Sequence, residues 1–76
     1  MFDLLKDVLV EKLRVSPIEV TMDATKEDLD LDSLAAVELA VILSKDHGID
    51  IPDDEMADAK TLADIVALMD SHRTLL

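Results

Sequence analysis

Apolar residues recur three or four positions apart in three parts of the chain, a spacing that places them on one face of an α-helix. The first part predicts a helix over residues 2–15, whose apolar face comprises Phe2, Leu5, Val8, Leu9 and Leu13. We expect this helix to end at Ser16-Pro17, because the residue before a proline is driven out of helical geometry. Lys12 and Arg14 then fall in its last turn, where positive charge suits the helix dipole.

The longest of the three parts predicts a central helix over residues 33–47, about four turns without a Gly or Pro. Asp32 is the expected N-cap, which places Ser33 in the first turn. Gly48 follows the last turn and supplies the left-handed backbone that helix C-termini favour. Both boundaries of this helix are therefore marked in the sequence.

Two apolar stripes run along the central helix when successive residues are placed about 100° apart. One stripe comprises Ala36, Leu39 and Leu43, broadened by Ala35, Ala40 and Ile42. The other comprises Leu34, Val37 and Val41, flanked by Glu38, Ser44 and Lys45. A small core needs one stripe, so the second is either surface kept apolar for a partner or a further buried face. The pattern leaves both interpretations open.

The remaining residues predict one long connection and two further helices. Residues 16–32 carry apolar side chains expected to tether this connection to the core: Ile18, Val20, Met22, Ala24, Leu29 and Leu31. One helical turn is expected over residues 25–28 and a short helix over residues 53–58. Thr61 starts the last helix, which buries Leu62, Ile65, Val66 and Met69 and frays from Ser71 to Leu76. Residues 1–76 thus predict a single all-α domain, a four-helix bundle with three principal helices, one short third helix and a long first loop.

The charge of the chain narrows the classes of partner. Seven basic and 18 acidic residues give a net charge of −11, which disfavours nucleic acids and anionic membrane surfaces. The expected partners are proteins with basic docking surfaces. No apolar run reaches transmembrane length, and the first residues lack the basic start of a signal peptide, so we expect a cytoplasmic monomer with no membrane insertion.

Two kinds of chemistry are disfavoured by the spacing of the polar residues. Asp28, Asp30 and Asp32 suggest a calcium loop, but Ser33 and Leu39 stand where such a loop needs Gly and Glu, so no metal site is predicted. A hydrolase would need a base beside Ser33, whereas His47 lies about 21 Å along the same helix. We therefore expect no enzymatic activity from this chain.

Ser33 remains as a possible attachment point. A phosphate esterified to its hydroxyl would meet free backbone N–H groups and the positive end of the helix dipole. The neighbouring acids would repel that phosphate, so they need another role, such as recruiting a basic enzyme. The simpler interpretation is an ordinary N-cap or first-turn serine.

Three segments together resemble the acyl carrier proteins in their order and spacing, over about residues 2–70. They are Leu-Asp-Leu-Asp-Ser-Leu-Ala-Ala-Val-Glu-Leu at residues 29–39, Gly-Ile-Asp-Ile-Pro-Asp at residues 48–53, and Thr-Leu-Ala-Asp at residues 61–64. The resemblance implies that a phosphopantetheinyl transferase attaches 4′-phosphopantetheine from coenzyme A to Ser33. The thiol of this arm would carry an acyl group as a thioester in a chain that has no cysteine.

The resemblance also implies roles for residues around Ser33. Asp32 matches the acid that helps position the metal and substrate of the transferase. Leu34, Val37 and Glu38 match positions that contact client enzymes, and Val41 and Ile51 match positions that border a cleft for the acyl chain between the second and third helices.

Several departures from the family pattern leave the pathway open. Asp30 stands where a Gly is frequent, His47 where an aromatic is frequent, and Ala35, Ser44 and Lys45 where fatty-acid carriers are often acidic. The resemblance implies that the carrier serves acyl-transferring and synthase enzymes, and these can belong to fatty-acid or to polyketide synthesis. The alternatives are an aminoacyl- or peptidyl-type carrier of a specialised pathway, and an unmodified helical adaptor that binds a protein through Leu34, Val37 and Val41.

Overall fold

The computed structural model describes residues 2–72 as a small helical bundle. Its elements in chain order are α1 (Phe2–Glu11), the 3-10 turn η1 (Pro17–Glu19), α2 (Ser33–His47), α3 (Asp53–Asp58) and α4 (Leu62–His72). The part of the chain described holds no β-strand, and Thr25 and Thr61 form an isolated antiparallel bridge. The predicted all-α fold, with three principal helices, a short third helix and a long first loop, is confirmed.

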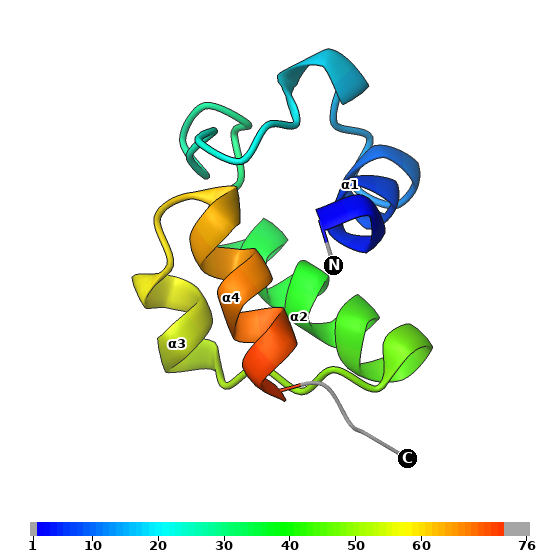
Figure 1. Ribbon diagram of the computed structural model, residues 1–76, viewed down its shortest axis with the longest axis vertical. Helices are drawn as coiled ribbons and strands as arrows, with labels where there is room; N and C mark the ends of the chain where they lie inside the picture. Colours follow the sequence, from blue (N-terminus) through cyan, green and yellow to red (C-terminus); the bar gives the residue numbers. More distant parts are fainter. Residues whose placement is uncertain (1, 73–76) are drawn as a thin grey trace.

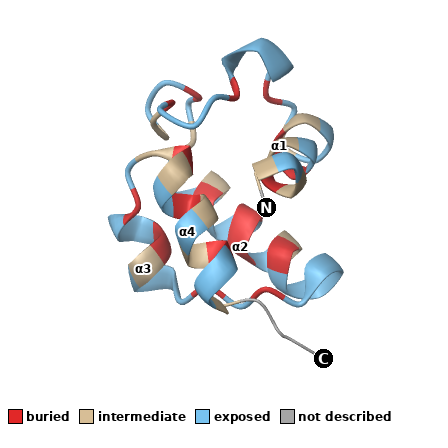
Figure 2. Cartoon of the chain, viewed as in Figure 1, coloured by how far each residue is buried: buried red, intermediate tan, exposed pale blue. Residues whose placement is uncertain are grey.

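The helices enclose one aliphatic core (Figure 2). α1 packs against α2 and α4, and α3 packs against the same two helices (Figure 1). The largest side chains with almost no exposure are Leu5, Leu9, Leu39, Leu43, Ile49, Met56, Leu62, Ile65 and Met69. Each contributes about 1.5–3 kcal/mol relative to an exposed position. None of the helices over residues 2–72 is long and apolar enough to cross a membrane.

The first helix ends earlier than its apolar pattern predicts. α1 stops at Glu11, where the prediction extended to residue 15, and Arg14 takes a left-handed conformation with φ of 59°. Val15 N donates to Leu9 O at 3.0 Å, which closes the turn and brings Val15 into the core. Lys12 and Arg14 therefore lie beyond the helix, and its last turn holds no basic residue.

The long connection between α1 and α2 is held by only some of its predicted tethers. Val20, Ala24 and Leu29 are buried and Leu31 is partly buried, as expected. Ile18 and Met22 are not tethers, because their side chains are 88% and 44% exposed. Ile18 lies in the exposed turn η1, and Met22 contributes through its backbone.

Backbone hydrogen bonds join this connection to the start of α4. Leu62 N donates to Ala24 O and Ala63 N donates to Met22 O, both at 2.9 Å, and Lys26 N donates to Lys60 O at 3.1 Å. In Figure 1 the connection accordingly runs over the end of the bundle where α4 begins. The segment that leads into α2 is thus held in place by its hydrogen bonds to residues 60–63.

The last helix begins with the predicted capping box. Asp64 N donates to Thr61 Oγ1 and Thr61 N donates to Asp64 Oδ2, both at 3.2 Å. Leu62, Ile65 and Met69 are buried as expected, while Val66 is only partly buried. The predicted fraying is wrong for Ser71 and His72, which are helical, and residues 73–76 lie outside the described residues. His72 Nε2 lies 2.9 Å from Glu55 Oε1, a contact that joins this end of α4 to α3.

Candidate functional site

The start of α2 presents Ser33 at the surface. Asp32 is the N-cap, with an extended backbone (φ −78°, ψ −176°), and its Oδ1 accepts from Ala35 N at 2.8 Å. Ser33 is the first residue of the helix and is exposed. Since Asp32 caps the helix, the hydroxyl of Ser33 is not required for capping. Ser33 is therefore a first-turn serine and not the N-cap, as its place after Asp32 predicts.

The two apolar stripes of α2 have different surroundings. Ala36, Leu39, Ala40 and Leu43 are buried, with Ala35 and Ile42 partly buried beside them. Leu34, Val37 and Val41 are 67%, 44% and 45% exposed. Glu38 is exposed on the same face. The second stripe is therefore surface, and the interpretation that α2 is buried on both sides is wrong.

A first hollow lies directly beside Ser33, between α2 and α3. Its volume is about 450 Å³, and its walls are mainly apolar. It is lined by Lys26, Leu31, Asp32, Ser33, Ala36, Val37, Asp53, Met56 and Ala57. Asp32 and Asp53 bring negative charge to this hollow, and Lys26 brings positive charge. Because Ser33 itself lines this hollow, an apolar group linked to its hydroxyl could be buried here, on the same side of α2.

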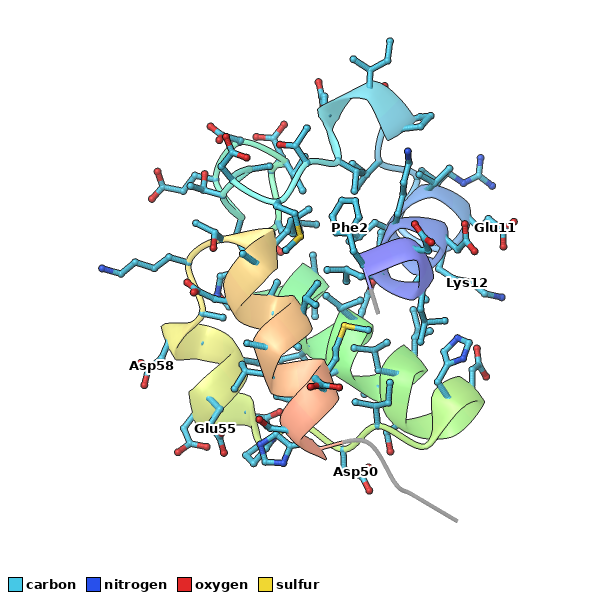
Figure 3. All side chains as sticks on the ribbon, viewed as in Figure 1. Phe2, Glu11, Lys12, Asp50, Glu55 and Asp58 are labelled. Atoms are coloured by element: carbon cyan, nitrogen blue, oxygen red, sulfur yellow. The ribbon has the colours of Figure 1, made fainter. Side chains whose placement is uncertain are left out.

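A second hollow follows along α2, at the end nearer Gly48. It also has a volume of about 450 Å³ and is lined by Ala40, Val41, Ser44, Lys45, Asp50, Ile51, Pro52 and Asp53. Ser44 Oγ donates to Asp50 Oδ1, which ties α2 to the segment leading to α3. Figure 3 labels Asp50 in this segment and Asp58 at the far end of α3. The second hollow shares Asp53 with the first.

The structure separates the predicted site residues into three groups. Asp32, Ser33 and Val37 line the first hollow, whereas Val41 and Ile51 line the second. Leu34 and Glu38 line neither hollow and are exposed on α2. Ile51 differs from the other predicted contact residues because its side chain is only 6% exposed. It can border a cleft, but it offers little surface to a partner.

Sequence reasoning did not include Lys26, Met56 and Ala57 among the site residues. All three line the first hollow beside Ser33. Met56 is in the short helix α3, and Lys26 comes from the long connection, so neither shares a periodic pattern with α2. The pairing of Thr25 with Asp28, which forms the turn around Lys26, is the one signal that could have pointed to it.

The two histidines lie away from the start of α2. His47 is the last residue of that helix, and His72 contacts Glu55 on α3. Among residues 2–72, no three His, Asp or Glu side chains gather closely enough to hold a metal ion. What the site presents is an exposed hydroxyl at a helix N-terminus, beside an apolar hollow.

Comparison with known proteins places these features in a family. The family model of the phosphopantetheine attachment site matches residues 3–69. The chain is 40% identical over 73 residues to the acyl carrier protein of Clostridium perfringens (strain SM101), covering 95% of this chain and 96% of that protein. It is 39% identical over 74 residues to the acyl carrier protein of Wolinella succinogenes, covering 96% and 97%, respectively. It is also 42% identical over 72 residues to the acyl carrier protein of Sulfurovum sp. (strain NBC37-1), covering 93% and 96%.

The match extends over the four helices and includes both the start of α2 and the α2–α3 surface. By its sequence and its fold, the chain belongs to the acyl carrier proteins, the family defined by a phosphopantetheine attachment site.

Proposed function

We propose that this protein carries acyl groups as thioesters on a 4′-phosphopantetheine arm joined to Ser33 Oγ. The observation that carries the proposal is the position of Ser33, exposed at the first residue of α2 and beside an apolar hollow. When bound, the arm supplies the thiol that the chain itself lacks, since its sequence has no cysteine. The family assignment supports the carrier role, and the attachment to Ser33 is the residue-level proposal.

The residues present at the start of α2 fit a phosphoester. The backbone N–H groups of the first turn and the positive end of the α2 dipole favour an anion on Ser33. Asp32 already binds one of these donors, Ala35 N, so its carboxylate is fixed to the helix. The remaining donors of the turn stay available to the phosphate.

The two hollows along α2 can shield an aliphatic cargo from water. Burial of each methylene is worth about 0.8 kcal/mol, so even a short chain gains from the first hollow. Val41 and Ile51 border the second hollow, which would take the more distant part of a longer chain. The residues of the chain thus protect a cargo by excluding water from it.

The surface of α2 supports a role in partner binding. Leu34, Val37 and Val41 form an exposed apolar stripe, with Glu38 and Asp32 as exposed acids on the same helix and at its cap. We propose that the phosphopantetheinyl transferase and the acyl-transferring enzymes bind here through basic docking surfaces with an apolar centre. In this proposal the chain delivers substrate and its clients perform the catalysis.

The attachment is tested by incubating the protein with coenzyme A and a broad-specificity phosphopantetheinyl transferase, followed by intact-mass measurement. The wild type should gain the mass of one phosphopantetheine group, and Ser33→Ala should gain none. Ser16→Ala is the matched control, because Ser16 is exposed and makes no capping hydrogen bond through its side chain. No gain on the wild type, or an equal gain on Ser33→Ala, would refute the proposal.

The exposed stripe also favours a second candidate, an unmodified helical adaptor that uses Leu34, Val37 and Val41. This candidate predicts that Ser33→Ala preserves biological activity while Val37→Glu abolishes it. The carrier predicts that Ser33→Ala abolishes activity.

Loading by adenylating enzymes, in place of acyl-transferring ones, would identify an aminoacyl carrier.

A further inference from the structure

The amine of Lys26 binds the last turn of α3. Lys26 Nζ donates to Met56 O at 2.8 Å and to Ala57 O at 3.2 Å. These carbonyls lie at the C-terminal end of the helix, where a positive charge is favoured by the dipole. The contact therefore joins the connection before α2 to the helix after it.

The backbone around Lys26 is fixed, so the amine is held in place. Thr25 N donates to Asp28 Oδ2 at 3.1 Å, and Asp28 N donates to Thr25 Oγ1 at 3.0 Å. Lys26 N donates to Lys60 O at 3.1 Å. Lys26 thus extends from a closed turn that is itself attached to the segment after α3.

α3 depends on such contacts because it is short. It has six residues, and Pro52 at its N-cap offers no side-chain hydrogen bond. Helices of this length have little stability of their own. Other side-chain contacts that hold α3 include the burial of Met56 in the core and the pairing of Glu55 with His72.

The same three residues form one wall of the first hollow. Lys26, Met56 and Ala57 line it from the connection and from α3, and Ser33, Ala36 and Val37 line it from α2. The hydrogen bonds of the amine therefore fix the wall that faces the proposed attachment point. A change in the position of α3 changes the width of this hollow.

We propose that Lys26 is a positioning residue that holds α3 and thereby sets how much of an aliphatic cargo enters the first hollow. This inference rests on the proposed function, since it concerns the cargo carried from Ser33. Without the amine, the two carbonyls lose a charged donor, and the last turn of α3 opens more often. The hollow then widens, and a longer part of the cargo leaves water.

The first test needs no arm and uses amide hydrogen exchange on the unmodified protein. In Lys26→Met, exchange over Met56–Ala59 should rise about tenfold, because a hydrogen bond to a charged donor is lost. Lys60→Met is the matched control, since it removes the same charge from a neighbouring exposed lysine whose amine does not cap α3. Equal exchange in α3 for Lys26→Met and the control would overturn the proposal.

The second test uses saturated acyl groups of increasing length, loaded through the arm at Ser33. For each length, the Tm of the loaded protein is compared with that of the protein bearing the arm alone. In the wild type and Lys60→Met the gain in Tm should level off at one chain length, and in Lys26→Met it should level off at a longer one. The same chain-length dependence in all three would overturn the proposal, whatever the exchange result.

Failure of the two proposals can be told apart. If Ser33 takes no arm, the proposed function fails, and the inference fails with it, although the exchange test still reports whether Lys26 holds α3. If Ser33 is modified and the chain-length dependence is unchanged, only the role of Lys26 is lost.

Discussion

Truncating one residue from each stripe of α2 should separate core from surface. Leu39 is 1% exposed and Val37 is 44% exposed, although they lie only two positions apart. Leu39→Ala removes a buried side chain and should cost about 3 kcal/mol, within the usual range of about 2–5. Val37→Ala removes a side chain already half in water and should cost less than about 1 kcal/mol.

These costs are large relative to the stability of the domain. At about 0.05–0.15 kcal/mol per residue, a chain of 76 residues is stable by about 4–11 kcal/mol. For a domain of this size, 1 kcal/mol corresponds to about 4–8 °C in Tm. Leu39→Ala should therefore lower the Tm by about 12–24 °C, and Val37→Ala by less than about 8 °C.

The assay is thermal and urea denaturation followed by far-ultraviolet circular dichroism, with both variants and the wild type at one salt concentration. An unchanged urea m-value shows that the variants unfold from the same compact state. Equal losses for Val37→Ala and Leu39→Ala would refute the reasoning, because the second stripe would then be part of the core and could not serve as a contact surface.

Three further predictions concern the loss of stability at low pH, the strained turn at Arg14 and the net charge. The backbone N–H groups of Lys60 and Thr61 hold the pKa of the Asp64 carboxyl below its usual range, so its stabilising effect is present above about pH 4 and is lost as the pH falls below that value. Asp64→Asn should thus lower the Tm at pH 7 more than at pH 3, and equal losses would contradict this. Arg14→Gly should raise the Tm by about 2–5 °C, since glycine adopts a φ of 59° without the strain of a side chain. A lower Tm would show that backbone strain at residue 14 does not limit stability. The charge of −11 should make the Tm rise with added salt or magnesium, and melts that do not shift would show that self-repulsion is negligible.

The sequence predicts best where the structural signal is local. α2 begins after Asp32 and ends before Gly48 as expected, because a capping carboxylate and a left-handed glycine act within a single turn. The capping box at Thr61 and Asp64 is predicted for the same reason. Ser33 could be identified as a candidate because three short segments, at residues 29–39, 48–53 and 61–64, keep the order and spacing of the family pattern.

The errors arise where no residue marks the local outcome or where distant segments decide it. Arg14 has no sequence signal for a left-handed conformation, so the end of α1 was predicted too late. Ile18 and Met22 have the composition of tethers, but the connection is held to α4 by backbone groups instead. The first hollow and Lys26 could not be predicted, because their arrangement requires α2, α3 and the connection to be packed together.

The backbone bonds between the connection and α4 also constrain how the chain folds. Ala24 and Leu62 stand about half the chain apart, and the loop that they close contains all of α2 and α3. Closing such a loop costs entropy before its contacts form, which raises the folding barrier above that of a bundle with only neighbouring contacts. A nascent chain cannot secure the connection until α4 has left the ribosome. The connection that leads to Ser33 is therefore secured only when α4 is present, and a chain truncated before α4 would lack both these bonds and the buried side chains of Leu62, Ile65 and Met69.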